Sequence, residues 1–431
     1  MTPSSSGGAD PLHDRNLLAD PDVAGRWRLR FWVVFGGQSL SLIGSVLTQF
    51  VLLWWITDTT GSVSALATAG LAALLPQALL APLGGTVADR YSRRFVMVAA
   101  DLVSALCMVV LIVLFTMARV DLVHVYALMA IRSAMQAFQA PAAAASVPML
   151  VPRAMISRVS GVNQAVQGLT VVAAAPLGAL ALGVMPIGWA LTIDVVTAVL
   201  GVAPLLYFAI PQPRREVDAS ASLVGSMWMD FREGAAFVWS SPGWRRIFAL
   251  LTGVMLVVMP SYTLVPLLVK SHFGGGAQEV ALIEGLAGLG MLLGGALVAV
   301  MAPRRHVLWV VLGFGASCLS LALTAIVPPG LFWIAVIWWT LSGVTYVFGN
   351  APLTSLLQTG VPVHLQGRVF SLLQAIVGFA APVGLAVVAP LGQVTEVDTL
   401  FVAMGLLGAG VSFSGLLSPR LLGLGVQERE S

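Results

Sequence analysis

Long stretches without a charged side chain alternate with short polar segments along most of this chain. Uncharged runs include Phe31 to Ile56, Val63 to Ala88 and Leu102 to Ala118. A helix needs about 20 apolar residues to cross a bilayer, so each run is long enough for one crossing. The pattern predicts twelve spans, near residues 29–56, 63–88, 95–117, 122–149, 162–184, 189–210, 246–268, 280–301, 307–327, 331–358, 369–391 and 398–417.

The composition supports the membrane assignment. Of the 431 residues, 58% are hydrophobic and 10% are charged, whereas about a quarter of the residues of a soluble domain are charged. A soluble enzyme with large buried helices could not cover its surface with 22 basic and 19 acidic side chains. The segment from Met1 to Gly25 lacks the regions of a cleaved signal peptide, so the spans themselves are expected to direct insertion.

The basic residues predict which ends of the spans face the cytoplasm. If the N-terminus is inside, Arg119 and Lys270 fall in outer loops and Arg132 falls within a span. The other 19 of the 22 basic residues fall on the inner side. This positive-inside bias predicts that both termini are cytoplasmic. The net charge of +3 then reflects an inner face that meets anionic lipid, and it requires no nucleic-acid partner.

The spans divide six and six around a polar linker. We expect a cytoplasmic tail at 1–28, a six-helix bundle at 29–210, the linker at 211–245, a second bundle at 246–417 and a tail at 418–431. Apolar residues recur at helical spacing within the linker, which predicts an amphipathic helix on the inner membrane surface. A lid or a partner site is the alternative. These apolar positions are Val224, Trp228, Phe231, Ala235 and Val238.

The two halves repeat each other at a constant separation of 210 residues, as from Gly84 to Gly294. A parallel duplication of six helices implies two bundles around an axis normal to the membrane, with a binding site between them near the midplane. The chain is therefore predicted to be an all-α integral membrane protein of two pseudo-symmetric six-helix bundles. Matched positions include Gly85 and Gly295, Arg94 and Arg304, Val151 and Val361, Arg158 and Arg368, and Gln164 and Gln374.

The loop after the second span carries a motif. Its sequence, GGTVADRYSRR, resembles the signature loop of the major facilitator superfamily, although Ser92 replaces the usual Gly. The resemblance covers the whole chain and implies the major facilitator fold. It also implies a charged latch that closes the cytoplasmic side in the outward-open state, while the glycines let two helices approach closely. The latch residues are Gly84, Gly85, Asp89, Arg90, Arg93 and Arg94.

Two further segments resemble the drug-exporting branch of this superfamily, which includes macrolide and enterobactin exporters. The fourth span contains IRSAMQAFQAP, with Arg132 followed by a glutamine. The fifth resembles the antiporter motif at Pro176 and Gly178, although Ala175 replaces its glycine. The resemblance implies efflux. Import of a small metabolite remains the alternative within the fold, and a non-transporting membrane sensor is an alternative outside it.

Four ionisable residues lie within predicted spans: Asp101, Arg132, Asp194 and Glu284. An unpaired charge at mid-bilayer costs roughly 3 kcal/mol, so each needs a partner, a wet cavity or neutralisation. Proton coupling requires a carboxyl group that gains and loses a proton during the cycle. Glu284 and Asp101 are the candidates, with Arg132 as a counter-ion. The alternative is a static pair, and for Asp194 a structural role is favoured.

Polar side chains form stripes at helical spacing on three spans, which the resemblance implies line a central cavity. Mixed amide and aromatic walls suit a bulky, partly apolar solute such as a drug or siderophore, and Arg132 would tolerate an anionic one. For a single glutamine, an interhelical hydrogen bond is the alternative. The stripes comprise Gln38, Ser41, Ser45 and Gln49; Arg132, Gln136 and Gln139; and Trp339, Ser342, Tyr346 and Asn350.

The sequence contains no pattern that indicates catalysis. Cys107 and Cys318 lie in separate apolar spans, which disfavours a disulfide or a metal site. No phosphate-binding loop and no nucleophile–base set occurs, so we expect neither an enzyme nor a cofactor. The expected partners are a small-molecule substrate, protons and the lipid bilayer. The protein is expected to be a monomer in the inner membrane of a bacterium.

Overall fold

The computed structural model describes residues 21–422 apart from 153–154, 209, 211–222 and 304. Most of the two predicted tails, residues 1–20 and 423–431, therefore lies outside the described part. So do the side chain of Asp89 and those of Val224 and Trp228 in the linker.

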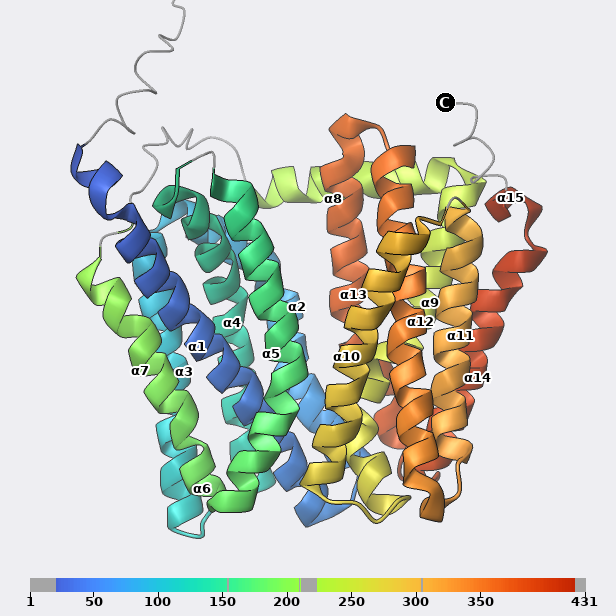
Figure 1. The fold of residues 1–431 in the computed structure, drawn as a ribbon, viewed down its shortest axis with the longest axis horizontal. Coiled ribbons are helices and arrows are strands. Elements are labelled where there is room, and N and C mark those ends of the chain that lie inside the picture. Colours follow the sequence, from blue (N-terminus) through green and yellow to red (C-terminus); the bar gives the residue numbers. More distant parts are fainter. Residues whose placement is uncertain (1–20, 153–154, 209, 211–222, 304, 423–431) are drawn as a thin grey trace, which may run out of the picture.

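All regular secondary structure of the described chain is helical (Figure 1). The first half contains α1 (Pro21–Thr60), α2 (Val63–Arg90), α3 (Arg93–Thr116), α4 (Leu122–Leu150), α5 (Ile156–Val184), the short α6 (Ile187–Ala190) and α7 (Thr192–Tyr207). The second half contains α8 (Leu223–Ser240), α9 (Pro242–Ser271), α10 (Ala277–Met301), α11 (His306–Ile326), α12 (Phe332–Gly360), α13 (Val363–Leu391), α14 (Val397–Ser414) and α15 (Pro419–Leu422), with single 3-10 turns at Pro329–Leu331 and Gly415–Leu417.

Eleven helical segments of the described chain are long and apolar enough to cross a membrane, where twelve crossings were expected. The difference is α4, which has 29 residues but is not among them. Its polar stripe of Arg132, Gln136 and Gln139 lowers its hydropathy. The helix is nevertheless part of the N-terminal bundle, where it packs on α2 and α3.

Hydroxyl side chains cap the starts of α2 and α3. Ser62 accepts a hydrogen bond from the backbone N–H of Ala65 at the start of α2, and Ser92 does the same for Phe95 at the start of α3. Such caps satisfy amide groups that have no partner within the helix. The turn between α1 and α2 passes through Gly61 at a φ of 57°, a left-handed conformation that favours glycine.

The duplication is visible in which helices touch. In the first half α2 and α3 pack on α4, and α1 packs on α7; in the second half α10 and α11 pack on α12, and α9 packs on α14. The repeated glycines also behave alike. A Cβ atom at Gly84 would overlap the Ala137 carbonyl oxygen of α4, and one at Gly294 would lie 2.7 Å from the Val344 carbonyl oxygen of α12.

The second glycine of each repeated pair does not make such a contact. A Cβ atom at Gly85 or at Gly295 would meet nothing within 4 Å. The expectation that both glycines of the signature loop permit close approach is therefore correct for Gly84 and wrong for Gly85, which points away from α4.

The hydrophobic cores differ between the two ends of the bundles. We call the end that carries α8 the α8 side and the opposite end the far side; α8 crosses the top of Figure 1. On the far side one continuous core joins both bundles and includes Leu52, Leu66, Leu268 and Leu385. On the α8 side the described residues form two separate cores, one around Val96 in the first bundle and another in the second.

Helix α8 packs on the second bundle. Val238 is buried in the core of that bundle, and a Cβ atom at Gly234 would lie 2.8 Å from the Arg368 carbonyl oxygen of α13. Glu233 forms an ion pair with the same Arg368. In the expected apolar stripe of this helix, Ala235 and Val238 contact the bundle, while Phe231 is exposed.

Candidate functional site

A cavity of about 590 Å³ lies between the two bundles. Its lining comes from the middle of α1, α2 and α5 in the first bundle and of α9, α10, α12 and α13 in the second. The far side below it is filled by the shared core, whereas the α8 side has separate cores. The arrangement places a central cavity near mid-membrane, with its closed end on the far side.

Aromatic and sulfur-containing side chains dominate the second-bundle wall of this cavity. Tyr262 and Trp339 stack edge to face with ring centroids 5.6 Å apart, and Met259 and Met291 lie beside them. Phe50 faces them from α1. Such walls adapt to bulky solutes of varied shape, because thioether and aromatic groups offer large polarisable surfaces.

Glu284 is the charged residue of the described cavity lining. It lies on α10 and is half-buried, and no hydrogen bond or ion pair of its carboxyl group occurs among the described residues. The other polar groups of the described lining are uncharged: the amides of Gln49 and Gln77, the hydroxyls of Tyr262 and Thr263, and the indole N–H of Trp339. A carboxyl group in this position is open to a solute and to water, but it has no fixed cation beside it.

A second, smaller cavity of about 240 Å³ lies inside the first bundle. It adjoins the central cavity through Gln49 and Gln77, which line both. Pro76 lies in α2 just before Gln77, whose backbone N–H donates a 3.1 Å hydrogen bond to the Ser133 hydroxyl of α4. The polar wall of this cavity brings together Asp101, Arg132 and Asp194, three of the four ionisable residues expected within spans.

These three charges are not equivalent. The Arg132 guanidinium and the Asp194 carboxylate form an ion pair at 2.7 Å, and Ser45 donates a 2.9 Å hydrogen bond to the other Asp194 oxygen. Asp101 instead accepts a 3.2 Å hydrogen bond from the neutral amide of Gln38, which in turn accepts one from Gln139 at 2.7 Å. The cavity therefore holds one compensated pair and one carboxyl group with an amide partner.

The predicted cavity residues separate into four groups. Gln49 and Trp339 line the central cavity, and Ser41, Ser45, Arg132 and Gln136 line the smaller one beside Gln49. Gln38 and Gln139 connect helices of the first bundle by the hydrogen bonds just described. Ser342 lines neither cavity, because it is buried against α11 and hydrogen-bonded to Ser317. Tyr346 and Asn350 are likewise outside both linings; Tyr346 packs on Phe314.

The signature-loop arginines bond within their own bundle. Arg93 is buried and donates a 2.6 Å hydrogen bond to the Ala145 carbonyl of α4, and Arg94 donates to the Leu206 carbonyl of α7. Arg90 is exposed at the end of α2. The side chain of Asp89 lies outside the described residues. The described contacts of this loop therefore lie within the first bundle, where they join α3 to α4 and to α7.

The antiporter-like segment of α5 lies where the bundles meet. Pro176 faces Gly285 of α10, where a Cβ atom would be 3.3 Å from its ring, and Gly178 packs against the ring of Phe50. Gly288 of α10 packs on Val172 in the same way. The motif thus contributes to the close contact of α5 with α10 on the far side.

Two contributions to the site were not predicted from sequence. Phe50 and Tyr262 line the cavity, but aromatic residues in an apolar span do not reveal which of its faces meets a cavity. The other is an ion pair on the far side, where Lys270 at the end of α9 contacts the Asp58 carboxylate of α1 at 2.7 Å. Lys270 is the single lysine of the chain and one of two cations expected on the outer side. A cation in this unusual position is a sequence signal that could have indicated the contact.

Comparison with known proteins identifies the family. A family model described as Major Facilitator Superfamily matches residues 34–385. The chain belongs to the major facilitator superfamily. Members of this superfamily are multi-pass membrane transporters and not enzymes, which agrees with the resemblance of the signature loop and with the all-helical two-bundle fold.

The relatives of this chain include bacterial efflux proteins. Macrolide efflux protein A of Streptococcus pyogenes is 30% identical over 382 residues, which are 88% of this chain and 94% of the relative. The multidrug efflux pump Tap of Mycolicibacterium fortuitum is 26% identical over 395 residues, with 88% and 93% coverage. The chain is thus related to drug-exporting members of the superfamily.

Solved structures share the fold at low sequence identity. A bacterial homologue of the iron transporter ferroportin, in an inward-facing state, is 15% identical with a TM-score of 0.65, covering 94% of this chain and 99% of the other. The nucleoside transporter NupG is 15% identical with a TM-score of 0.63, at 92% and 99% coverage. The predicted major facilitator fold is therefore confirmed.

Proposed function

We propose that this transporter exports a bulky, partly apolar organic solute in exchange for protons, by alternating access. The observation that carries the proposal is the cavity of about 590 Å³ between the bundles, with aromatic walls and one carboxyl group. Its volume is within the range of about 300–1,000 Å³ that is usual for drug-sized ligands. The efflux function named for the relatives supports the direction of transport.

The α8 side is proposed to face the cytoplasm of a bacterial cell. It carries most of the described arginines, including Arg90, Arg158, Arg245 and Arg305, as the positive-inside rule requires. In this orientation the cavity is closed toward the outside by the shared core. The solute would enter from the cytoplasm or from the inner leaflet.

Glu284 is proposed to carry the coupling proton, with Asp101 as the second carboxyl group that can do so. Glu284 faces the cavity without a fixed cation, so its protonation is free to change with solute occupancy and with access to either side. A charged group within a membrane is retained only where it serves a purpose that outweighs its insertion cost. The Arg132–Asp194 pair is compensated, and this favours a structural role for both of its members.

Outward opening would exchange contacts at the two ends. The far-side core and the Lys270–Asp58 ion pair would separate. On the α8 side the signature loop, with Asp89 and Arg90, would approach the second bundle and act as the latch. In this proposal the contact of Pro176 with Gly285 of α10 helps to keep the far side closed until outward opening.

Transport into energised inverted membrane vesicles tests this function. A radiolabelled macrolide, fluorescent drugs and labelled siderophores would be offered, with a protonophore as the energetic control. We expect protonophore-sensitive accumulation by the wild type and its loss in Glu284→Gln. Glu279→Gln is the matched control, since Glu279 lies on the same helix outside the cavity lining and caps its start through the Gly276 N–H.

The possible outcomes separate the alternatives. Accumulation by Glu284→Gln at the wild-type level would remove Glu284 as the coupling group, and Asp101→Asn would then be measured in the same way. If no solute accumulates in inverted vesicles while energised cells take one up through this protein, the transporter is an importer.

A further inference from the structure

A groove of about 430 Å³ lies on the perimeter of the second bundle, away from both transport cavities. It runs between the beginning of α9 and the end of α14, and α15 closes one end. Buried Leu250 and Leu421 form its apolar floor. None of its lining residues is shared with the central cavity or with the smaller cavity.

The open side of this groove faces lipid. Leu417 on its wall is 86% exposed, and Val411 is also exposed. Large apolar side chains with this exposure, on helices that cross a membrane, meet acyl chains and not water. Lipid can reach a groove at such a position, and the polar groups of the groove would decide which lipid it retains.

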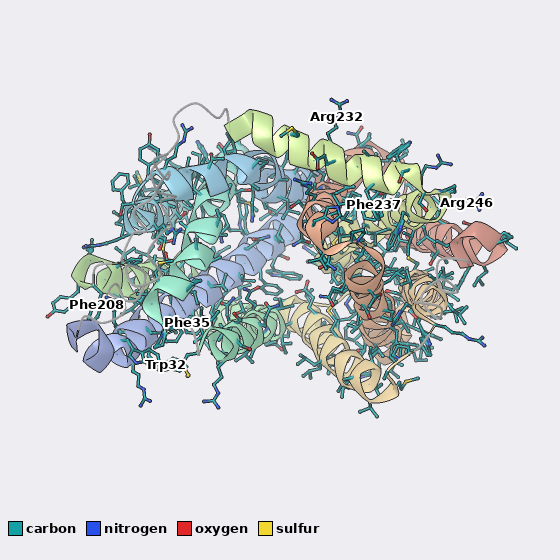
Figure 2. The ribbon with its side chains drawn as sticks, turned by 90° about the horizontal axis from the view of Figure 1, so that it is seen from above. Trp32, Phe35, Phe208, Arg232, Phe237 and Arg246 are labelled. Carbon is teal, nitrogen blue, oxygen red and sulfur yellow. The ribbon has the colours of Figure 1, made fainter. Side chains whose placement is uncertain are left out.

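The polar end of the groove is basic. Arg246 lies on the first turns of α9 and is exposed, and Figure 2 shows it at the edge of the second bundle beside the last helices of the chain. Its guanidinium donates a hydrogen bond to the Ser418 hydroxyl, and Ser414 lies in the same lining. Within the described chain, no carboxylate forms an ion pair with Arg246.

The height of Arg246 along the bundle suits a headgroup. It lies one turn into a helix that begins at Pro242 on the α8 side, so it lies close to the end of the membrane-crossing segment. A guanidinium has five N–H donors, and one bond to Ser418 leaves others for a phosphate group. Basic pockets between membrane helices at this level bind anionic headgroups.

We propose that this groove is a binding site for an anionic phospholipid. The headgroup phosphate would accept hydrogen bonds from Arg246 and from the hydroxyl of Ser418, which accepts from Arg246 and keeps its own hydrogen free. One acyl chain would follow the apolar floor past Leu250 and along Leu417. Among the described residues this end of the groove has a positive charge and no neighbouring carboxylate, so the cation of a zwitterionic headgroup would find no partner there.

Native mass spectrometry of the full-length protein tests the proposal. The protein would be purified into mixed micelles of detergent with phosphatidylglycerol or with phosphatidylcholine. We expect retention of one phosphatidylglycerol that survives activation, and no retained phosphatidylcholine. Arg246→Gln removes a charge-assisted hydrogen bond and should retain phosphatidylglycerol roughly tenfold less.

Arg245→Gln is the matched control, because Arg245 is the exposed neighbour of Arg246 and does not line the groove. It should bind lipid as the wild type does. Ala249→Phe keeps the arginine but fills the groove, since Ala249 is an exposed lining residue, and should also lose the lipid. The thermal unfolding midpoint in phosphatidylcholine micelles checks that each variant is folded.

Equal retention by Arg246→Gln and Arg245→Gln would overturn the site. Retention that is unchanged by Ala249→Phe would show that the acyl chain does not lie in this groove, which would also overturn the site. Inorganic phosphate at millimolar concentration should not displace phosphatidylglycerol. If it does, the guanidinium binds a free anion and the lipid proposal is wrong. None of these measurements depends on which solute is transported.

Discussion

The two bundles share one helical plan but handle charge in different ways. The first bundle holds Asp101, Arg132 and Asp194 in an inner cavity, where they have amide and hydroxyl partners. The second bundle presents an aromatic wall to the central cavity, and Glu284 is the charged residue of that wall among the described residues. The duplication preserved the packing positions of the helices, as Gly84 and Gly294 demonstrate, while the interiors diverged. We infer that the first bundle is the more rigid wall and that the second carries the group that responds to solute.

The comparison is tested most severely at Glu284. In vesicles, Glu284→Gln should reduce uphill accumulation to the level seen with a protonophore, because it removes the carboxyl group of the described central lining. Counterflow of solute against unlabelled solute should persist, because the cavity is otherwise unchanged. Loss of counterflow together with accumulation would assign Glu284 to solute binding or folding and not to coupling.

Arg132 should determine stability more than coupling. Arg132→Gln leaves the Asp194 carboxylate buried without its cation, at 3% side-chain exposure. Removal of one partner from a buried ion pair costs about 3–5 kcal/mol. The expected result is a large fall in the thermal unfolding midpoint of the purified protein. The double variant Arg132→Gln with Asp194→Asn should recover most of that loss, and a failure to recover would contradict the assignment of a static pair.

The repeated glycines provide a matched set across the two bundles. Gly84→Ala and Gly294→Ala each force a methyl group against a backbone carbonyl of the neighbouring helix. Overpacking of this kind costs about 1–3 kcal/mol. Gly85→Ala and Gly295→Ala, which meet no neighbour, should leave the unfolding midpoint almost unchanged. Equal shifts of the midpoint for Gly84→Ala and Gly85→Ala would contradict the close approach of α2 to α4. Equal shifts for Gly294→Ala and Gly295→Ala would contradict that of α10 to α12.

The smallest effect is expected at the far-side ion pair. Asp58 is 58% exposed, and ion pairs between exposed groups contribute about 0.2–1 kcal/mol. Asp58→Asn should shift the equilibrium slightly toward separation of the far side. Distances between spin labels at Thr59 and Val394, in a background with Cys107 and Cys318 replaced by alanine, would report the shift. A change as large as that caused by bound solute would mean that the pair is the main closure.

Much of the fold could be predicted from the hydropathy pattern because a bilayer permits few alternatives. Every backbone amide in a crossing segment must be hydrogen-bonded within it, so an apolar run of sufficient length becomes a helix. The pattern identified even α4, whose hydropathy is reduced by Arg132, Gln136 and Gln139. The close contacts between helices could not be predicted from hydropathy in the same way. The sequence does not show that Gly84 points toward a helix and Gly85 away from one.

The site was predicted in part. Periodicity places residues on one face of a helix, but it does not say what that face meets. On α12 it grouped Trp339, which lines the cavity, with Ser342, which bonds Ser317 of α11. It could not reveal Phe50 or Tyr262, because aromatic residues in a span are as frequent in cores. The pairing of Arg132 with Asp194 also depends on how α4 and α7 are placed around the smaller cavity, which sequence spacing does not encode.

The shared core of the far side has a thermodynamic consequence. Separation of the bundles there would transfer buried apolar surface, including Leu52, Leu66 and Leu268, toward water. Exposure of apolar surface increases the heat capacity, and the hydrophobic free energy that opposes it weakens on cooling. The far-side core should therefore oppose opening less at low temperature. The temperature dependence of transport then reports how much apolar surface is exposed on opening.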